Sequence, residues 1–512
     1  MLYVKNLTIM LEKDLRTLIK DFNVFIDRFS KVAFIGEEGN GKSTVLKFMA
    51  SKKLDNGIRI VSGKLVDKDE VVCYLPQQLS NRYLSMTPGE YIEYNFDLNY
   101  IDYTNLYSLL EELSLNKELI FDYEITIGNL SGGERLKFLL LCELLKNPTV
   151  LLLDEPNNDL DMDSLIWLEN FIIKSKLTIV FVSHDKRILE RCSNVIVDFE
   201  QVMKKKESRI TVFKGDYRTY VDYKANKFEN QTKQHNKEQE LYDKKYKRYN
   251  EIYTKVHHLQ NQAVRDPLVA KNLKDKMRSL KSQEKRLHKE KGAITKRPDY
   301  EDSILIKLAS NNIYDSKKVL NFKLDKLEIN GKLLVEDCSI NIIGPQKIAI
   351  IGNNGVGKTS LLNEILNYMI KNKMDFSYMP QDYNEKLDKN ITVVDYLKRN
   401  IVEYNRDMID IMLGSLNFTR EEMMHPVSKL SEGQRAKVFL AEIMIEKKDI
   451  IILDEPTRNL SIKSKDELFR VLKMFAGVVI FVSHDREFVD NLATTIYKIE
   501  NKKLLKIKSI EK

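Results

Sequence analysis

At 512 residues the chain is too long for a single hydrophobic core and has the length of two or three domains. With 43% hydrophobic and 31% charged residues, its composition is that of a globular protein and excludes a disordered one. The first ten residues lack the apolar segment of a signal peptide, and no stretch approaches the roughly 18 to 20 apolar residues of a membrane span. We therefore expect a protein without a membrane-embedded domain.

The cysteines indicate a reducing compartment. Cys73, Cys142, Cys192 and Cys338 lie far apart and form no CxxC pair. This spacing predicts neither a zinc site nor a disulfide framework. The expected location is the cytoplasm.

The net charge of +8 is concentrated in one segment. Residues 222–297 contain 21 Lys and Arg against 10 Asp and Glu, so the rest of the chain has a net charge of about −3. A local basic surface attracts polyanions, and binds nucleic acid by releasing counterions. The alternative is a solvated helix face without a partner.

The chain contains an internal repeat. The sequence FIGEEGNGKST at 34–44 recurs as IIGNNGVGKTS at 350–360, and LLLDEPNNDLD recurs as IILDEPTRNLS. LSGGERLKFLLL and IVFVSHDKRIL likewise recur as LSEGQRAKVFLA and VIFVSHDREFV. A repeat of this kind predicts two homologous domains. We expect a first cassette at 1–215, a basic linker at 216–300 and a second cassette at 301–512.

Each cassette carries a glycine-rich phosphate-binding loop (P-loop) with the pattern GxxxxGK[ST], between an apolar strand and a helix. Glycines let backbone N–H groups surround phosphate oxygens, the lysine neutralises the β and γ phosphates, and the hydroxyl ligates Mg²⁺. Two matches in the same context predict α/β domains that bind ATP. The predicted phosphate contacts are Gly36, Gly39, Gly41, Lys42, Ser43 and Thr44 in the first cassette, and Gly352, Gly355, Gly357, Lys358, Thr359 and Ser360 in the second.

Acidic residues and a histidine follow the later strands. Asp154 and Asp454 end apolar runs and are placed to hold Mg²⁺, and the next residues, Glu155 and Glu455, can polarise the attacking water. His184 and His484 follow strands that end in FVS and are suited to contact the γ-phosphate. A purely structural histidine is the alternative.

LSGGE at 130–134 resembles the signature of ATP-binding-cassette (ABC) ATPases, and the resemblance covers both cassettes. In that family the cassettes face head to tail, so each ATP lies between one P-loop and the opposite signature. The resemblance implies a first site that adds Gln78, Ser431 and Gly433. It implies a second site that adds Gln381, Ser131, Gly132 and Gly133. The implied Mg²⁺ contacts are Ser43, Gln78, Asp154, Thr359, Gln381 and Asp454.

The second cassette departs from this pattern at two positions. Glu432 stands where a glycine is usual, and Ser461 stands where the first cassette has Asp161. A carboxylate near the phosphates weakens binding by like-charge repulsion. We hypothesise unequal sites, with slower hydrolysis at the first; a Glu432 side chain turned to solvent is the alternative.

The linker pattern predicts an antiparallel helical hairpin. Tyr242, Tyr246, Tyr249, Tyr253 and Val256 form one helical stripe, and Leu273, Met277, Leu280 and Leu287 form a second stripe, interrupted by Glu284. Asp266-Pro267 is a helix start, which places the tip near 259–268. The tip residues expected to contact rRNA are Gln260, Asn261, Gln262, Val264 and Arg265. A simple spacer between the cassettes is the alternative.

Tandem cassettes joined by a basic hairpin resemble the ABC-F proteins. The resemblance implies a monomeric cytoplasmic ATPase that uses ATP and Mg²⁺ and enters the ribosomal E site. Its linker would reach toward the peptidyl-transferase centre, large-subunit rRNA and P-site tRNA, and hydrolysis would permit release. The absence of a long insertion between P-loop and Gln78 favours the antibiotic-resistance group over a housekeeping translation factor. A transporter ATPase subunit and a DNA-associated ATPase are the more distant alternatives.

Overall fold

The computed structural model describes residues 1–507 except 13–14, 55, 68, 122–123, 159, 203–206, 263–266, 296–305, 307, 309–312, 330, 384–385, 388–389, 400–405 and 459. For residues 121, 261–262, 267–270, 332 and 406 the backbone alone is described. The chain divides into two compact units, Met1–Tyr217 with Glu301–Lys512, and Arg218–Tyr300. Among the described helices we find none with the length and apolar character of a membrane span.

The first cassette is built on a six-stranded sheet with the strand order β5-β6-β7-β3-β8-β9. The first five strands in this order, β5, β6, β7, β3 and β8, pair in parallel. Strand β9 pairs antiparallel with β8 at one edge of the sheet. The six strands are β3 (Lys31–Gly36), β5 (Val72–Leu75), β6 (Val150–Asp154), β7 (Thr178–Val182), β8 (Val195–Gln201) and β9 (Glu207–Lys214). A separate antiparallel sheet contains β1 (Leu2–Leu11), β2 (Thr17–Ile26) and β4 (Ile58–Val66).

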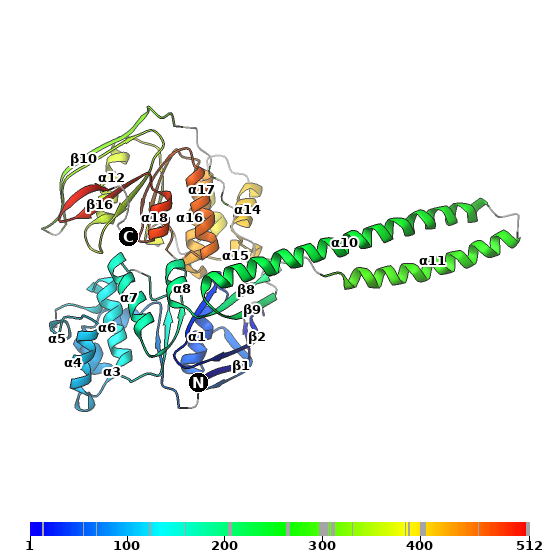
Figure 1. Cartoon of the computed structure of the whole chain (residues 1–512). Helices are drawn as coiled ribbons and strands as arrows, with labels where there is room; N and C mark the ends of the chain where they lie inside the picture. Colours follow the sequence, from blue (N-terminus) through cyan, green and yellow to red (C-terminus); the bar gives the residue numbers. More distant parts are fainter. Residues whose placement is uncertain are drawn as a thin grey trace. The chain divides into compact units, whose positions relative to one another are not determined.

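The helices of the first cassette include a helical subdomain between β5 and the signature, as the sequence predicts (Figure 1). The subdomain contains α2 (Asn81–Leu84), α3 (Pro88–Asn95), α4 (Tyr103–Glu112) and α5 (Glu118–Phe121), with 3-10 turns at Leu98–Tyr100 and Ile127–Asn129. The remaining helices are α1 (Lys42–Ser51), α6 (Gly132–Leu144), α7 (Met162–Lys174) and α8 (Lys186–Cys192).

The second cassette repeats this plan in one eight-stranded sheet with the order β10-β11-β17-β16-β12-β15-β14-β13. Its strands are β10 (Lys318–Ile329), β11 (Lys332–Ile343), β12 (Lys347–Ile351), β13 (Ser377–Met379), β14 (Ile450–Asp454), β15 (Val478–Val482), β16 (Thr495–Glu500) and β17 (Lys503–Ile507). Its helices are α12 (Lys358–Lys371), α13 (Val393–Arg399), α14 (Arg406–Ser415), α15 (Arg420–Met423), α16 (Glu432–Glu446), α17 (Ile462–Met474) and α18 (Arg486–Leu492), with a 3-10 turn at Val427–Lys429.

Both faces of the central strands are buried, which explains their continuous apolar runs. Alternate residues of β12 point to opposite cores: Ile348 and Ile350 pack with α12, whereas Ala349 and Ile351 pack with the cluster that includes α16, α17 and α18. All five residues of β6 and of β14 are buried. This layering brings Asp154 and Asp454 to the carboxyl ends of parallel strands, the edge at which such sheets bind ligands.

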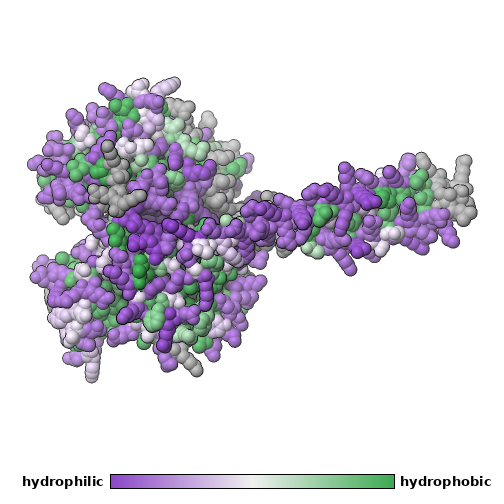
Figure 2. Space-filling model, viewed as in Figure 1, coloured by the Kyte–Doolittle hydropathy of each residue, from purple (hydrophilic) through white to green (hydrophobic). Residues whose placement is uncertain are grey.

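The second unit is an antiparallel pair of helices, α10 (Tyr217–Gln262) and α11 (Pro267–Ala293), which lie side by side (Figure 1). At 1.5 Å per residue they are about 69 and 40 Å long. The seam contains Tyr242, Tyr249, Val256, Leu280 and Leu287, all buried. The rest of the visible hairpin surface is mostly hydrophilic (Figure 2).

Polar contacts complete the seam. Lys245 Nζ lies 2.8 Å from Glu290 Oε2, and the Thr295 amide donates to Glu238 Oε2 at 2.6 Å. Burial and the neighbouring Glu284 carboxylate raise the pKa of Tyr249, so the glutamate that interrupts the apolar stripe faces a tyrosine. The sequence therefore predicts the hairpin and most of its seam.

The linker differs from the sequence prediction at Tyr246, and part of its predicted tip lies outside the described residues. The helical stripe predicts Tyr246 in the seam, but its side chain is 43% exposed, and the centroid of its ring lies 5.8 Å from that of Tyr242 in a stacked arrangement. Helix α11 begins at Pro267 as predicted. Of the predicted tip contacts, Gln260 lies half-buried in α10, only the backbone of Asn261 and Gln262 is described, and Val264 and Arg265 lie outside the described residues.

Candidate functional site

The two P-loops have matching backbone geometry. The three glycines adopt φ angles of 139°, 75° and 92° at Gly36, Gly39 and Gly41, and 155°, 75° and 100° at Gly352, Gly355 and Gly357. Most of these values lie in the left-handed region that glycine tolerates at no steric cost. Gly41 and Gly357 begin α1 and α12 without a side-chain cap, so the first N–H groups of each helix are available to phosphate oxygens.

Each P-loop lysine closes its own loop. Lys42 Nζ donates to the carbonyls of Gly36 and Glu37 at 2.8 and 2.9 Å. Lys358 Nζ donates to the carbonyls of Gly352 and Asn353, both at 2.9 Å. Burial lowers the pKa of Lys358. Both ammonium groups are thus held where a phosphate chain would lie against the loop.

The hydroxyl after each lysine lies beside an acidic or amide side chain. Ser43 Oγ donates to Asp154 Oδ1 at 2.9 Å, and Tyr74 OH donates to Asp154 Oδ2 at 3.0 Å. Thr359 Oγ1 lies 3.5 Å from Gln381 Oε1. Burial raises the pKa of Asp154, although these two hydrogen bonds oppose the shift. The neighbouring residues Thr44 and Ser360 lie in the first turns of α1 and α12.

Glu155 and Glu455 adopt strained backbone conformations, with φ angles of 48° and 53°. Such angles are costly for non-glycine residues and cluster at functional sites. Burial raises the pKa of both carboxyls, that of Glu455 to about 7. A carboxyl with a pKa near neutrality is well matched to general-base chemistry.

The two histidines lie beside these glutamates. His184 Nε2 is 3.8 Å from Glu155 Oε1, and His484 Nε2 is 3.5 Å from Glu455 Oε1. Burial, with Lys42 and Lys465, holds the pKa of His184 well below its usual value, which keeps the ring neutral. Within the described residues, neither ring nitrogen of His184 makes a hydrogen bond. A neutral imidazole can donate one hydrogen bond to a ligand oxygen, from the ring nitrogen that carries the hydrogen.

Each signature serine caps a helix. Ser131 and Ser431 accept hydrogen bonds from the amides of Glu134 and Gln434, and each forms a capping box. A Cβ at Gly133 would lie 2.1 Å from Ser164 Oγ, so the signature glycine allows α6 to pack against α7. Gly433 is buried at the corresponding place in α16.

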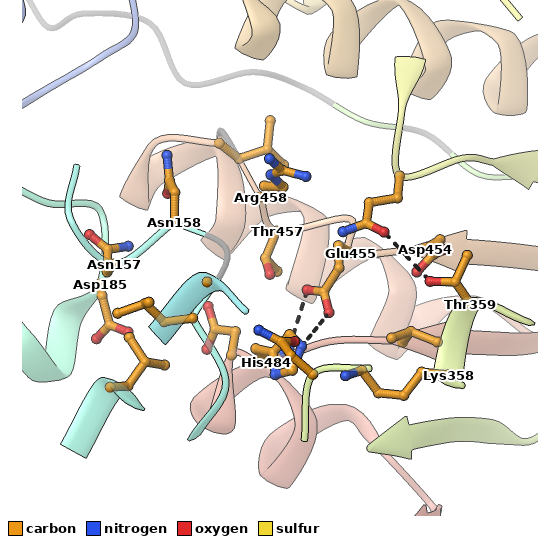
Figure 3. A pocket seen from close by; sticks show the side chains of 18 of the residues that line it. Asn157, Asn158, Asp185, Lys358, Thr359, Asp454, Glu455, Thr457, Arg458 and His484 are labelled. Atoms are coloured by element: carbon orange, nitrogen blue, oxygen red, sulfur yellow. Dashed lines mark hydrogen bonds and ion pairs between the residues drawn. The ribbon is translucent and has the colours of Figure 1, made fainter. Parts of the chain in front are cut away.

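A cavity of about 410 Å³ joins the second P-loop to the first cassette. Lys358, Thr359, Asp454, Glu455 and His484 line one part (Figure 3). Gly132, Glu155 and His184 of the first cassette line another. The structure thus brings the first signature to the second P-loop, which is the pairing implied by the ABC resemblance.

The two adjacent glutamines after β5 have different partners. Gln77 Nε2 donates to Glu155 Oε2 at 2.9 Å, whereas Gln78 Nε2 donates to Glu432 Oε1 at 2.7 Å. Gln77 is also the residue that follows proline, as Gln381 does. The matching segments Leu75-Pro76-Gln77 and Met379-Pro380-Gln381 align Gln77 with Gln381, a sequence signal for Gln77 that the assignment of Gln78 does not use. The Glu432 side chain contacts the first cassette instead of turning to solvent alone.

The family with the description ABC transporter matches residues 19–158 and 335–458, which are the parts of the two cassettes that carry the P-loops, signatures and Asp-Glu pairs. The chain belongs to the ABC transporter family. The ATP-binding protein Uup of Haemophilus influenzae is 28% identical over 529 residues, covering 92% of this chain and 74% of that protein. The ribosome protection protein VmlR of Bacillus subtilis is 26% identical, covering 95% of this chain and 84% of that protein.

Within this family the chain is an ABC-F protein. ABC transporter F family member 2 of Arabidopsis thaliana is 26% identical, covering 95% of this chain and 73% of that protein. A solved complex of the archaeal ribosomal stalk protein aP1 with the ribosome recycling factor aABCE1 contains a similar fold, with a TM-score of 0.60 and 17% identity, covering 98% of this chain and 89% of that chain. This ABC-F protein binds nucleotide and hydrolyses ATP.

Proposed function

We propose that this ABC-F protein is a cytoplasmic, ribosome-associated ATPase that protects the large ribosomal subunit from antibiotics. The observation that carries the proposal is the joining of two ATPase cassettes by a hairpin whose segment 222–297 holds 21 basic against 10 acidic residues. A basic, elongated element of this kind suits a cavity lined with rRNA phosphates. The domain boundaries predicted above, 1–215, 216–300 and 301–512, are part of the proposal.

At each ATP site the chain's own residues have separate roles. The P-loop amides and Lys42 or Lys358 bind the phosphates, and Glu155 or Glu455 orients and deprotonates the attacking water. His184 or His484 contacts the γ-phosphate, and the opposite signature, through Ser431 and Gly433 or through Ser131, Gly132 and Gly133, completes each site. Positioning and charge dominate phosphoryl transfer, so closure of the cassettes is what assembles the reactive geometry.

The residues beside the P-loops fit Mg²⁺. This ion prefers one or two carboxylates together with phosphate oxygens and water. At the first site, Ser43 and Asp154 offer these donors, and Gln78 or the adjacent Gln77 can add a further oxygen. At the second site, Thr359, Asp454 and Gln381 offer the same set. The described residues include no group of three or more His, Cys, Asp and Glu able to hold an ion without phosphate. When bound with the nucleotide, Mg²⁺ would be held by these residues and would supply positive charge that offsets the charge of the phosphates.

The hairpin is the ribosome-binding element in this proposal. Its tip, including Gln260, Asn261, Gln262, Val264 and Arg265, contacts large-subunit rRNA near the peptidyl-transferase centre, beside P-site tRNA. The name of the relative VmlR, a ribosome protection protein, supports this assignment over a housekeeping translation factor, which remains the second candidate. The protein acts as a monomer because its two cassettes supply both halves of each ATP site.

Sedimentation with ribosomes tests the proposal. The double variant Glu155→Gln, Glu455→Gln keeps the hydrogen-bonding shape of both side chains and removes the base, so it should trap ATP. We expect it to co-pellet with ribosomes in ATP but not in ADP, and the wild-type chain to co-pellet weakly. A trapped variant that binds ATP yet stays in the supernatant with ATP would overturn the ribosome as partner.

Growth measurements then separate protection from a housekeeping role. We expect expression of the wild-type chain to raise the inhibitory concentration of at least one large-subunit antibiotic. Substitution of Gln262 and Arg265 by alanine should remove this effect while ATP-dependent co-pelleting persists. Ribosome binding without any change in drug sensitivity would favour the housekeeping alternative.

A further inference from the structure

The two P-loops differ in charge at the same two positions. Glu37 and Glu38 occupy the first loop, between Gly36 and Gly39, where Asn353 and Asn354 occupy the second. Acidic side chains in a loop that binds polyphosphate oppose the charge of its ligand. The presence of two acidic side chains in this loop therefore has to be explained by contacts other than those with phosphate.

Both glutamates contact the second cassette at the start of α17. Ser461 Oγ donates to Glu37 Oε2 at 2.7 Å, and the Ser461 amide donates to Glu38 Oε1. Lys437 Nζ of α16 lies 3.4 Å from Glu38 Oε2, with both side chains about nine-tenths buried. Ser461 itself is 1% exposed. The first P-loop is thus joined to the second cassette by buried, charge-assisted hydrogen bonds, which are the stronger class.

The opposite contact has the reverse charge arrangement. The Asn354 amide donates to Asp161 Oδ2 and Asn353 Nδ2 donates to Asp163 Oδ2, both at 3.3 Å. There the acids belong to the helix start of the first cassette, and the P-loop is neutral. An aspartate at position 461 would place a third carboxylate beside Glu37 and Glu38. At one interface the acidic side chains belong to the P-loop and the helix start is an uncharged serine. At the other interface the P-loop is uncharged and the helix start is acidic.

The carboxylates of Glu37 and Glu38 add negative charge beside the phosphate site of the first P-loop. Burial and the Glu38 carboxylate raise the pKa of Glu37, which reflects the cost of a negative charge at this position. A triphosphate bound at Lys42 would add further negative charge beside these two side chains. Lys437, which offsets part of that charge, is already engaged by Glu38. The second P-loop carries no such carboxylate on its own loop.

We propose that Glu37 and Glu38 make the first P-loop a nucleotide-independent anchor for the second cassette, at the cost of triphosphate affinity. The first site then binds ATP more weakly, and the second site is the one at which ATP controls opening and closing. Glu37 and Glu38 are positioning residues, because they act through Ser461 and Lys437. These contacts lie within the ATPase core, so the difference between the two sites holds whether or not the ribosome is the partner.

Single-site backgrounds test the difference in affinity. Lys358→Ala leaves the first P-loop intact, and Lys42→Ala leaves the second. We measure binding of a non-hydrolysable ATP analogue with Mg²⁺ by calorimetry. The first site should bind at least about tenfold more weakly, a difference of about 1.4 kcal/mol. Glu37→Asn with Glu38→Asn should bring the two affinities to within about threefold of each other.

The matched control places the acids in the other loop. Asn353→Glu with Asn354→Glu, in the Lys42→Ala background, should weaken the second site, since the new carboxylates face Asp161 as well as phosphate. Equal affinities in the two backgrounds, or a first site unchanged by the asparagine pair, would overturn the proposal.

The anchor is tested without nucleotide by thermal unfolding. Ser461→Asp should lower Tm in the wild-type chain, because three carboxylates then meet, and should have little effect when Glu37 and Glu38 are asparagine. An equal decrease in Tm in both chains would show that the contact of Ser461 with Glu37 and Glu38 does not anchor the second cassette, and would overturn the proposed anchor.

Discussion

Glu455 combines a strained backbone with a carboxyl whose pKa burial raises to about 7. A base must be ionised to accept a proton, so the competent fraction of Glu455 rises as pH increases through this value. In the Lys42→Ala background, which isolates the second site, we expect ATP turnover to increase about tenfold between pH 6 and pH 8. Turnover measured across that interval that stays flat would contradict Glu455 as the base. Glu455→Gln, inactive at every pH, is the control.

Gln77 provides a second prediction for single residues. Its amide donates to Glu155 Oε2, to which Asn158 Nδ2 also donates at 2.9 Å. Loss of a group that orients a catalytic side chain costs rate through misplacement. In the Lys358→Ala background we expect Gln77→Ala to lower turnover about tenfold or more. The adjacent Gln78→Ala is the control and should have a smaller effect. A larger effect of Gln78→Ala would show that Gln78, and not Gln77, is the glutamine on which turnover depends.

At the scale of elements, the sequence predicts what local pattern determines. The P-loops, the buried strands and the hairpin follow from glycine spacing, continuous apolar runs and helical stripes, each encoded within a few residues. Contacts between distant segments have no such signal. The bonds from Ser461 to Glu37 and Glu38 join residues more than 400 positions apart. The left-handed φ of Glu155 likewise follows from its setting in the fold, because glutamate has no intrinsic preference for that region.

The exposed ring of Tyr246 was not predictable for the same reason, because its exposure depends on how much of α10 the partner helix α11 covers. Spacings of three and four keep tyrosines near one helical face, but the stripe is wider than the seam that one partner helix covers. Tyr249 at 4% exposure and Tyr246 at 43% therefore form a matched pair on α10. We expect Tyr249→Ala to destabilise the hairpin by about 2 to 4 kcal/mol, and Tyr246→Ala by well under half of that. Hydrogen exchange of α10 and α11 amides measures both, and equal loss of protection would show that Tyr249 does not hold the seam.

For the whole molecule, the separation of charge predicts how ribosome binding responds to salt. The segment 222–297 is strongly basic while the rest of the chain carries a net charge of about −3. Binding that neutralises phosphates weakens with salt, and each contact contributes about 0.7 to 0.9 to the slope of log K against log salt. Contacts made by the cassettes alone would give a much smaller slope.

Replacement of Lys276, Lys281 and Lys285, all exposed on α11, by glutamine tests the source of that slope. We expect the trapped Glu155→Gln, Glu455→Gln chain to lose up to about 2 from the slope when these lysines are changed. Lys323, Lys326 and Lys371, exposed in the second cassette, give a control with the same loss of charge. If both triple variants lower affinity and slope equally, net charge governs the association and the hairpin is not its specific contact. A loss confined to the α11 variant would assign the phosphate contacts to the hairpin, because the two chains carry the same total charge.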